Sequence, residues 1–199
     1  MQNHYTFNRN EQHLDVNYTN YYWFEQGFTS EELVRIENLT SNLEWETAAT
    51  GQDDKTKVSN YRKSKIKWCP QNDEWSWVYS KLHDMIVESN NSMWKFDLTS
   101  MSEQIQYTEY YEGGGHYDWH MDCGIGMQNR RKVSVTVQLS SPDEYEGGDL
   151  DFNIGTQLTA PRAKGAAVIF PSFYLHRVTP VTKGTRKSFV LWVGGEPYK

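Results

Sequence analysis

From residue 103 onward, the chain is a series of short runs rich in β-branched and aromatic residues, separated by turn-forming residues. Runs of this length and composition are typical of β-strands joined by tight turns. They read EQIQYTEYY, RKVSVTVQLS, EGGDLDFN, GAAVIFP, HRVTPV and KSFVLWVGG. Many short strands after helices predict an antiparallel sandwich or barrel, with HRVTPV and KSFVLWVGG as separate strands on either side of the turn TKGT.

The run RKVSVTVQLS alternates between apolar and polar residues. Successive residues of a strand point to opposite faces, so the valines should form one face and the polar residues the other. We expect the valine face in the core and a polar pocket beside Ser134, Thr136 and Gln138. In EGGDLDFN, the adjacent residues Gly147 and Gly148 predict a hairpin turn with positive φ angles.

Two segments before residue 100 have helical periodicity. FTSEELVRIENLTSNLEW begins with a capping box, in which Thr29 or Ser30 precedes Glu32, and NDEWSWVYSKLHDMIVESN spaces its apolar residues along one helical face. Both helices should pack on the sheet. The polar segment 47–65 between them predicts a surface loop that returns to extended structure near Ile66, and it is a candidate lid.

Composition narrows the class of protein. The chain has 199 residues and no long apolar run, which predicts one domain over residues 1–199 and excludes a membrane span. Its N-terminus lacks the features of a secretion signal, so we expect a cytoplasmic protein. Cys69 and Cys123 form no CxxC pair and indicate neither a disulfide framework nor a thiolate zinc site. The formal net charge of −6 disfavours nucleic acid as a partner.

The segment GHYDWHMDCG contains a candidate metal site. His120 and Asp122 are two residues apart, so on a strand they would point to one face. Such a pair also arises often by chance, but His176 and Arg186 follow in FPSFYLHRVTPVTKGTR. Two imidazoles and one carboxylate form the facial triad of iron oxygenases, and arginine suits the far carboxylate of a 2-oxo acid. His116 is not expected to be a fourth ligand.

These motifs resemble the iron(II)- and 2-oxoglutarate-dependent dioxygenases of the prolyl 4-hydroxylase type. The family pattern Y-x-x-G-G-x-Y-x-x-H-x-D, a distal histidine and a basic residue ten positions later correspond to YEGGGHYDWHMD, His176 and Arg186. YEGGDL, FPS and HRVTPVTKGTR resemble its bacterial and phage branch. The similarity covers about residues 103 to 195, and YRKSKIKW extends it faintly towards residue 60.

The resemblance implies a mainly β fold with flanking helices. Its core would be a double-stranded β-helix, a cupin-like jelly-roll over about residues 100–195, with helical support over about residues 25–95 packed on one sheet.

The resemblance also implies roles for individual residues. His120, Asp122 and His176 would bind Fe(II), Arg186 and Tyr111 would bind 2-oxoglutarate, and Tyr117 would line the reaction chamber. Some relatives contribute a second tyrosine where this chain has Gln138. Dioxygen would be the oxidant, with ascorbate as a stimulant. Arginine at position 186, where collagen-type members usually have lysine, shifts the analogy away from collagen-type substrates.

The expected activity is hydroxylation of a C–H bond, foremost of a prolyl residue in a peptide or protein, with release of succinate and CO2. Two alternatives stay open. The substrate could be a free amino acid or another small metabolite, and Arg62, Lys63 and Lys65 offer charge for an acidic one. The chain could also be a non-catalytic metal-binding jelly-roll, because a fold alone does not imply chemistry.

Overall fold

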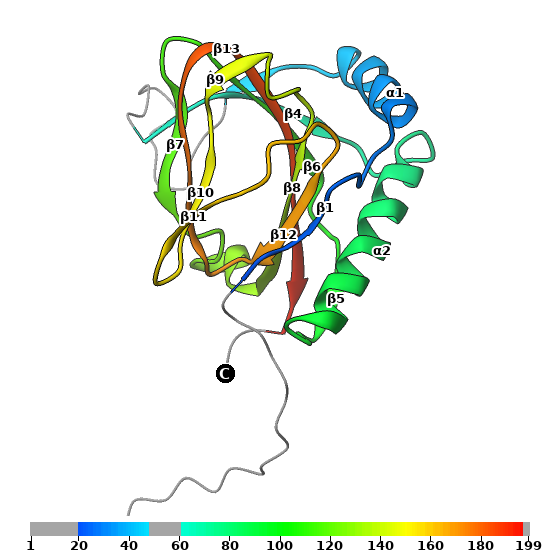
Figure 1. The fold of residues 1–199 in the computed structure, drawn as a ribbon. Coiled ribbons are helices and arrows are strands. Elements are labelled where there is room, and N and C mark those ends of the chain that lie inside the picture. Colours follow the sequence, from blue (N-terminus) through cyan, green and yellow to red (C-terminus); the bar gives the residue numbers. More distant parts are fainter. Residues whose placement is uncertain (1–19, 48–60, 197–199) are drawn as a thin grey trace, which may run out of the picture.

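The computed structural model describes residues 20–47 and 61–196. Two antiparallel sheets face each other and form a flattened barrel, with two helices outside one of them (Figure 1). The larger sheet has the order β1-β12-β8-β13-β6-β4-β2, and β5 pairs with the end of β13. The opposite sheet contains β3, β7, β9, β10 and β11, and β13 also pairs with its strands. This is the expected jelly-roll.

The element bounds follow the chain order. The strands of the larger sheet are β1 (Tyr22–Phe24), β2 (Glu46–Thr47), β4 (Lys65–Cys69), β5 (Leu98–Ser100), β6 (Ile105–Tyr111), β8 (Arg131–Gln138) and β12 (Ala167–Pro171). Those of the opposite sheet are β3 (Arg62–Lys63), β7 (Gly115–His120), β9 (Tyr145–Gly147), β10 (Leu150–Asn153) and β11 (Gln157–Thr159). The remaining elements are β13 (Leu175–Gly195), the α-helices α1 (Ser30–Ser41) and α2 (Ser76–Ser92), and the 3₁₀ helix η1 (Gly126–Arg130).

Both helices lie where the sequence predicts them. Thr29 caps α1 and forms the predicted capping box with Glu32. The apolar faces of α1 and α2 pack on the outer side of the larger sheet, against Val133, Val135 and Val137 of β8. Burying a valine side chain stabilises a fold by about 1.5 to 3 kcal/mol, so this interface holds the helices in place. The alternation in β8 therefore has the predicted result, and its polar residues face the space between the sheets.

Strand β13 corrects the prediction of two strands divided by a turn. It is continuous from Leu175 to Gly195, and its first half pairs with β7, β9 and β10 while its second half pairs with β6 and β8. Gly184, in the predicted turn TKGT, has φ 71° and bends the strand from one sheet into the other. The chain does not reverse here, because the residues before Gly184 pair with strands of the opposite sheet and those after it pair with strands of the larger sheet.

Gly147 and Gly148 have the predicted positive φ angles, 71° and 64°. The predicted hairpin is wrong, however. Strands β9 and β10 on either side of these glycines both pair with β13 rather than with each other. The two glycines therefore bend an edge of the sheet, so that β9 and β10 follow the curved course of β13.

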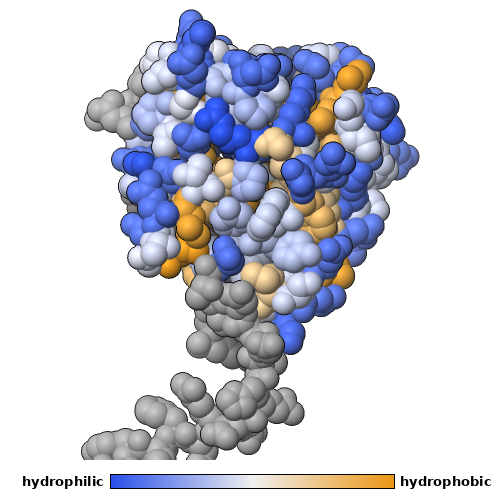
Figure 2. Space-filling model, viewed as in Figure 1, coloured by the Kyte–Doolittle hydropathy of each residue, from blue (hydrophilic) through white to orange (hydrophobic). Residues whose placement is uncertain are grey.

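The N-terminal part of the chain contributes strands as well as helices. Strand β4 confirms the predicted return to extended structure near Ile66, and β3 adds an edge next to β7. Of the candidate lid at 47–65, residues 48–60 lie outside the described residues. Figure 2 shows a largely hydrophilic face with separate apolar patches. Within residues 20–47 and 61–196, no helix combines the length and the apolar character that a membrane span requires.

Candidate metal centre and pocket

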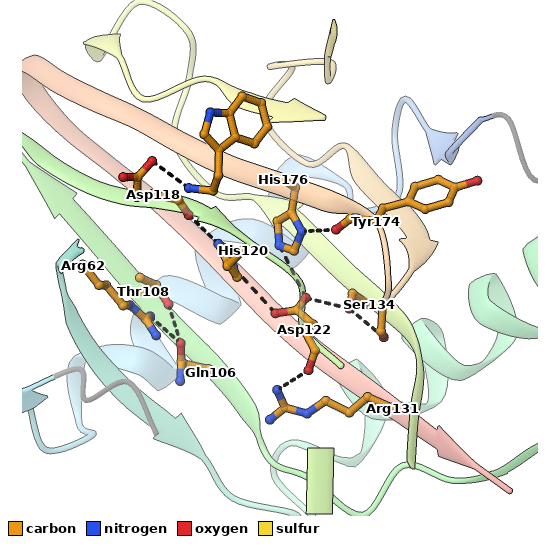
Figure 3. Close-up of polar contacts among 12 residues, drawn as sticks. Arg62, Gln106, Thr108, Asp118, His120, Asp122, Arg131, Ser134, Tyr174 and His176 are labelled. Atoms are coloured by element: carbon orange, nitrogen blue, oxygen red, sulfur yellow. Dashed lines mark hydrogen bonds and ion pairs between the residues drawn. The ribbon is translucent and has the colours of Figure 1, made fainter. Parts of the chain in front are cut away.

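The structure brings His120, Asp122 and His176 together from two strands and a loop. His120 ends β7, Asp122 follows it, and His176 lies opposite His120 in the pairing of β7 with β13. Their candidate ligand atoms all lie within 4.8 Å of one another, and all three residues are buried. Figure 3 shows the two imidazoles pointing towards the Asp122 carboxylate, whose oxygens lie 3.7 Å from Nε2 of His120 and 3.5 Å from Nε2 of His176.

Backbone carbonyl groups orient both imidazoles. Nδ1 of His120 lies 2.7 Å from the carbonyl oxygen of Asp118, and Nδ1 of His176 lies 2.8 Å from that of Tyr174. A carbonyl oxygen only accepts hydrogen bonds, so each Nδ1 carries the proton and each Nε2 presents its lone pair. Burial, together with the nearby His176, lowers the pKa of His120 to about 3. His120 is therefore a neutral imidazole, the form that binds metal.

Asp122 is held by contacts that sequence reasoning did not assign. Ser134 Oγ donates to its Oδ2 at 2.7 Å, and the backbone N–H of Asp122 donates to the carbonyl oxygen of Ser172 at 2.9 Å. Arg131, bound to both carboxylate oxygens of Glu103, also donates to the carbonyl oxygen of Asp122. Burial alone would raise the pKa of Asp122, but the two imidazoles, Ser134 and Arg131 outweigh it and lower that pKa. The carboxylate is thus ionised.

The polar face of β8 is the sequence signal that points to Ser134. The alternation places Ser134 beside a polar pocket, although it does not identify Asp122 as the partner. Arg131 and Glu103 are far apart in the sequence and carry no comparable signal.

One pocket between the sheets contains the whole cluster. Besides the three cluster residues, its walls include Arg62, Gln106, Tyr110, Tyr117, Thr136, Leu150, Val178, Arg186, Ser188 and Trp192. The ring of Tyr117 stacks on that of His120, with centroids 3.5 Å apart. Tyr117, the expected chamber residue, therefore lines the same pocket as the cluster. The walls combine apolar surface with a few converging polar groups, as ligand sites generally do.

Tyr110, rather than the expected Tyr111, lines this pocket. The two tyrosines are neighbours in β6, so their side chains point to opposite faces of the sheet. Tyr110 is buried, and its ring centroid lies 5.6 Å from Cζ of Arg186. The ring of Tyr111 instead lies near the ammonium groups of Lys63 and Lys65. The hydroxyl group expected in the pocket therefore comes from Tyr110, because the side chain of Tyr111 lies on the face of β6 that is turned away from the pocket.

Arg186 is a buried cation that forms no ion pair with any residue in the described part of the chain. Only 1% of the residue is exposed, and its guanidinium donates to Gln138 Oε1 at 3.0 Å and to Ser188 Oγ at 3.4 Å. Its Nε has no hydrogen-bond partner, and no carboxylate in residues 20–47 or 61–196 pairs with it. A buried charge is costly unless it is paired, so this pocket favours an anionic ligand. Gln138 orients the guanidinium.

The fold and the site together define a jelly-roll protein with a cluster of two histidines and one aspartate that could hold a metal ion. A family model described as the 2OG-Fe(II) oxygenase superfamily matches residues 105–194. A PKHD-type hydroxylase of Saccharophagus degradans is 31% identical over 176 residues, which cover 81% of this chain and 77% of that protein. The chain belongs to the 2OG-Fe(II) oxygenase superfamily, which implies Fe(II) and 2-oxoglutarate.

Other relatives match over a shorter span. A PKHD-type hydroxylase of Delftia acidovorans is 44% identical over 90 residues, which cover 41% of this chain and 39% of that protein. Across this and several further PKHD-type hydroxylases, the chain spans between 39% and 64% of the relative's length.

Solved structures share the fold. A prolyl hydroxylase from Trichoplax adhaerens, in complex with a hypoxia inducible factor peptide fragment, superposes with a TM-score of 0.72 at 16% identity, over 89% of this chain and 84% of that one. The viral collagen prolyl hydroxylase from Paramecium Bursaria Chlorella virus-1, as a 2-oxoglutarate complex, gives a TM-score of 0.62 at 20% identity over 92% and 98%. The expected fold class is confirmed.

Proposed function

We propose that this chain is an Fe(II)- and 2-oxoglutarate-dependent oxygenase that hydroxylates a prolyl residue in a peptide or protein, releasing succinate and CO2. The observation that carries the proposal is Arg186, a buried cation without a carboxylate partner among the described residues, in the same pocket as the cluster of His120, Asp122 and His176. A metal centre and an anion site in one pocket are what a 2-oxo acid co-substrate needs. We also propose that residues 1–199 form a single oxygenase domain.

The three cluster residues would hold the iron. Their donor set of two imidazoles and one ionised carboxylate suits Fe(II), and the orientation of both Nε2 atoms towards Asp122 fits a shared ion. The chemistry that the iron supplies when bound is activation of dioxygen, at the positions that three protein ligands leave open. The protein contributes ligand orientation through Ser134 and the two backbone carbonyl groups.

The other pocket residues would bind and orient the organic molecules. Arg186 would pair with the far carboxylate of 2-oxoglutarate, and Tyr110, close to its guanidinium, would add a hydroxyl group. Tyr117 covers one face of His120 and would position the target C–H bond while excluding water. A hydroxylase is supported by the name of the relatives, PKHD-type hydroxylase, and a prolyl substrate by the structural neighbours, which include the Trichoplax adhaerens prolyl hydroxylase with its peptide.

The test is succinate formation from 2-oxoglutarate by anaerobically Fe(II)-loaded protein after oxygen and ascorbate are added, with and without proline-containing peptides. We expect peptide-stimulated turnover and a peptide mass gain of one oxygen atom. His176→Ala and Arg186→Gln should abolish turnover, whereas Arg162→Gln, a change at a half-buried arginine that is paired with Asp149 outside the pocket lining, should not.

Two results would contradict the proposal. Metal-replete protein that neither consumes nor binds 2-oxoglutarate would indicate a non-catalytic metal-binding module. Succinate formation that is stimulated by a free amino acid or another small molecule, and by no peptide, would retain the oxygenase but replace its substrate.

A further inference from the structure

Arg62 places a second positive charge in the pocket. It lies on the short strand β3, where it pairs with Tyr117 of β7. Cζ of Arg62 lies 4.7 Å from the centroid of the Tyr117 ring, and that ring stacks on the His120 ring, with centroids 3.5 Å apart. The Tyr117 ring therefore lies between this guanidinium and His120 of the candidate metal centre. Arg62 and Arg186 line the same pocket.

The hydrogen-bond partners of Arg62 are neutral. Its Nη2 donates to Gln106 Oε1 at 2.7 Å, as Figure 3 shows, and its Nε donates to Ser64 Oγ at 2.9 Å. No carboxylate in the two described ranges forms an ion pair with it, whereas Arg131 and Arg177 each bind one. The adjoining Asp118 of β7 directs its carboxylate to the backbone N–H of Trp119 instead.

The formal charges of the loaded pocket do not balance. Among the residues that line it, Asp122 carries one negative charge and Arg62 and Arg186 carry two positive charges. A divalent iron and the dianion of 2-oxoglutarate cancel each other. The loaded pocket therefore keeps one positive charge, and in a partly desolvated site this favours a ligand with one negative charge.

We propose that the substrate carries a carboxylate group close to the carbon that is hydroxylated, and that Arg62 binds this carboxylate. The inference rests on the proposed oxygenase function and narrows its substrate class. The carboxylate could belong to an aspartate or glutamate next to the target residue of a peptide, or it could be the free α-carboxylate of a small substrate. A neutral carbonyl group would accept a hydrogen bond from Arg62 but would leave its charge unbalanced.

The test compares probes that differ only in this charge. Protein loaded with Mn(II) and 2-oxoglutarate is titrated with blocked peptides that flank proline with either glutamate or glutamine, and separately with N-acetyl-L-proline or its amide. We expect the carboxylate member of one pair to bind at least about tenfold more tightly, the size of effect typical of a hydrogen bond to a charged group. The pair that shows the difference identifies the source of the carboxylate.

Variants connect the preference to Arg62. Arg62→Gln should remove the difference between the paired probes, and Arg62→Lys, which keeps the charge, should retain part of it. Lys63→Gln is the matched control, because Lys63 neighbours Arg62 but donates to the carbonyl oxygen of Gly113 outside the pocket lining, and it should keep the preference.

The outcomes separate this inference from the proposed function. Equal binding of both members in both pairs, or a preference that survives Arg62→Gln, would overturn the inference. Succinate formation by the same preparation loaded with Fe(II) would then leave the oxygenase function standing. Protein that neither binds nor consumes 2-oxoglutarate would refute the function itself.

Discussion

The hydroxyl group of Ser134 donates a hydrogen bond of 2.7 Å to Oδ2 of Asp122. This contact joins β8 of the larger sheet to the loop that follows β7 of the opposite sheet, and it fixes the rotation of the carboxylate that faces both imidazoles. The same hydroxyl lies 2.9 Å from Ser172 Oγ, so its own orientation is constrained. The geometry of the candidate metal centre therefore depends on the packing of one sheet against the other.

Ser134→Ala should weaken metal binding by about 10- to 100-fold, because Asp122 loses the partner that orients it. Competition with a chelator for bound Mn(II) would measure the change. Ser89→Ala is the control, since Ser89 is equally buried but bonds the carbonyl oxygen of Ile86 within α2. Both variants should lose about 1 kcal/mol of stability, and equal metal affinity in the two would show that Ser134 does not position Asp122.

Tyr110→Phe should raise the dissociation constant for 2-oxoglutarate by about 2- to 10-fold, the range expected for one lost hydrogen bond. Tyr111→Phe should leave it unchanged, because that side chain lies on the opposite face of β6 from the pocket. Titration calorimetry with Mn(II)-loaded protein would measure both constants. A raised dissociation constant for Tyr111→Phe alone would contradict this prediction and would support the sequence-based expectation that Tyr111 binds 2-oxoglutarate.

Gly184→Ala should destabilise the protein by about 3 kcal/mol or more. The residue has φ 71°, and an added Cβ would lie 2.0 Å from the carbonyl oxygen of Glu144. Gly126→Ala is a matched control with the same φ of 71° and open space around the added atom, so it should cost only about 1 to 2 kcal/mol. Urea denaturation would measure the free energy of unfolding of both variants. Similar losses of stability would mean that the backbone of β13 shifts at its bend to accommodate the added Cβ.

The metal-free protein should lose stability as the pH falls below about 6.5. The pKa of His120 is about 3 in the folded chain and 6.5 ordinarily, so between these values only the unfolded state takes up the proton. Lowering the pH from 7 to 5 should therefore cost about 2 kcal/mol through this group. Urea denaturation with a chelator present would measure it, and His120→Asn should reduce the pH dependence by that amount. An unchanged dependence would exclude His120 as its source.

The local pattern of the sequence predicted both helices and most of the strands, and it picked out the three residues of the candidate metal centre. Periodicity identified α1, α2 and the inward polar face of β8, because each depends on residues a few positions apart. His120 and Asp122, two residues apart, and His176 and Arg186, ten residues apart, form two local pairs in the sequence, and the structure brings both pairs into one pocket.

Tertiary structure decided which more distant residues complete the site. Ser134 reaches Asp122, and Arg62 reaches Gln106 in the pocket, from strands that are far apart in the sequence, and no local pattern encodes those contacts. Tyr110 replaced Tyr111 because a shift of one residue moves a side chain to the other face of a strand. The sequence by itself thus determined the helices, the mainly β character of the fold and the residue types gathered at the candidate metal centre. Only the pairing of β13 with both sheets decided where the strand bends and which side chains face the metal centre, because hydrogen bonds between distant strands set that register.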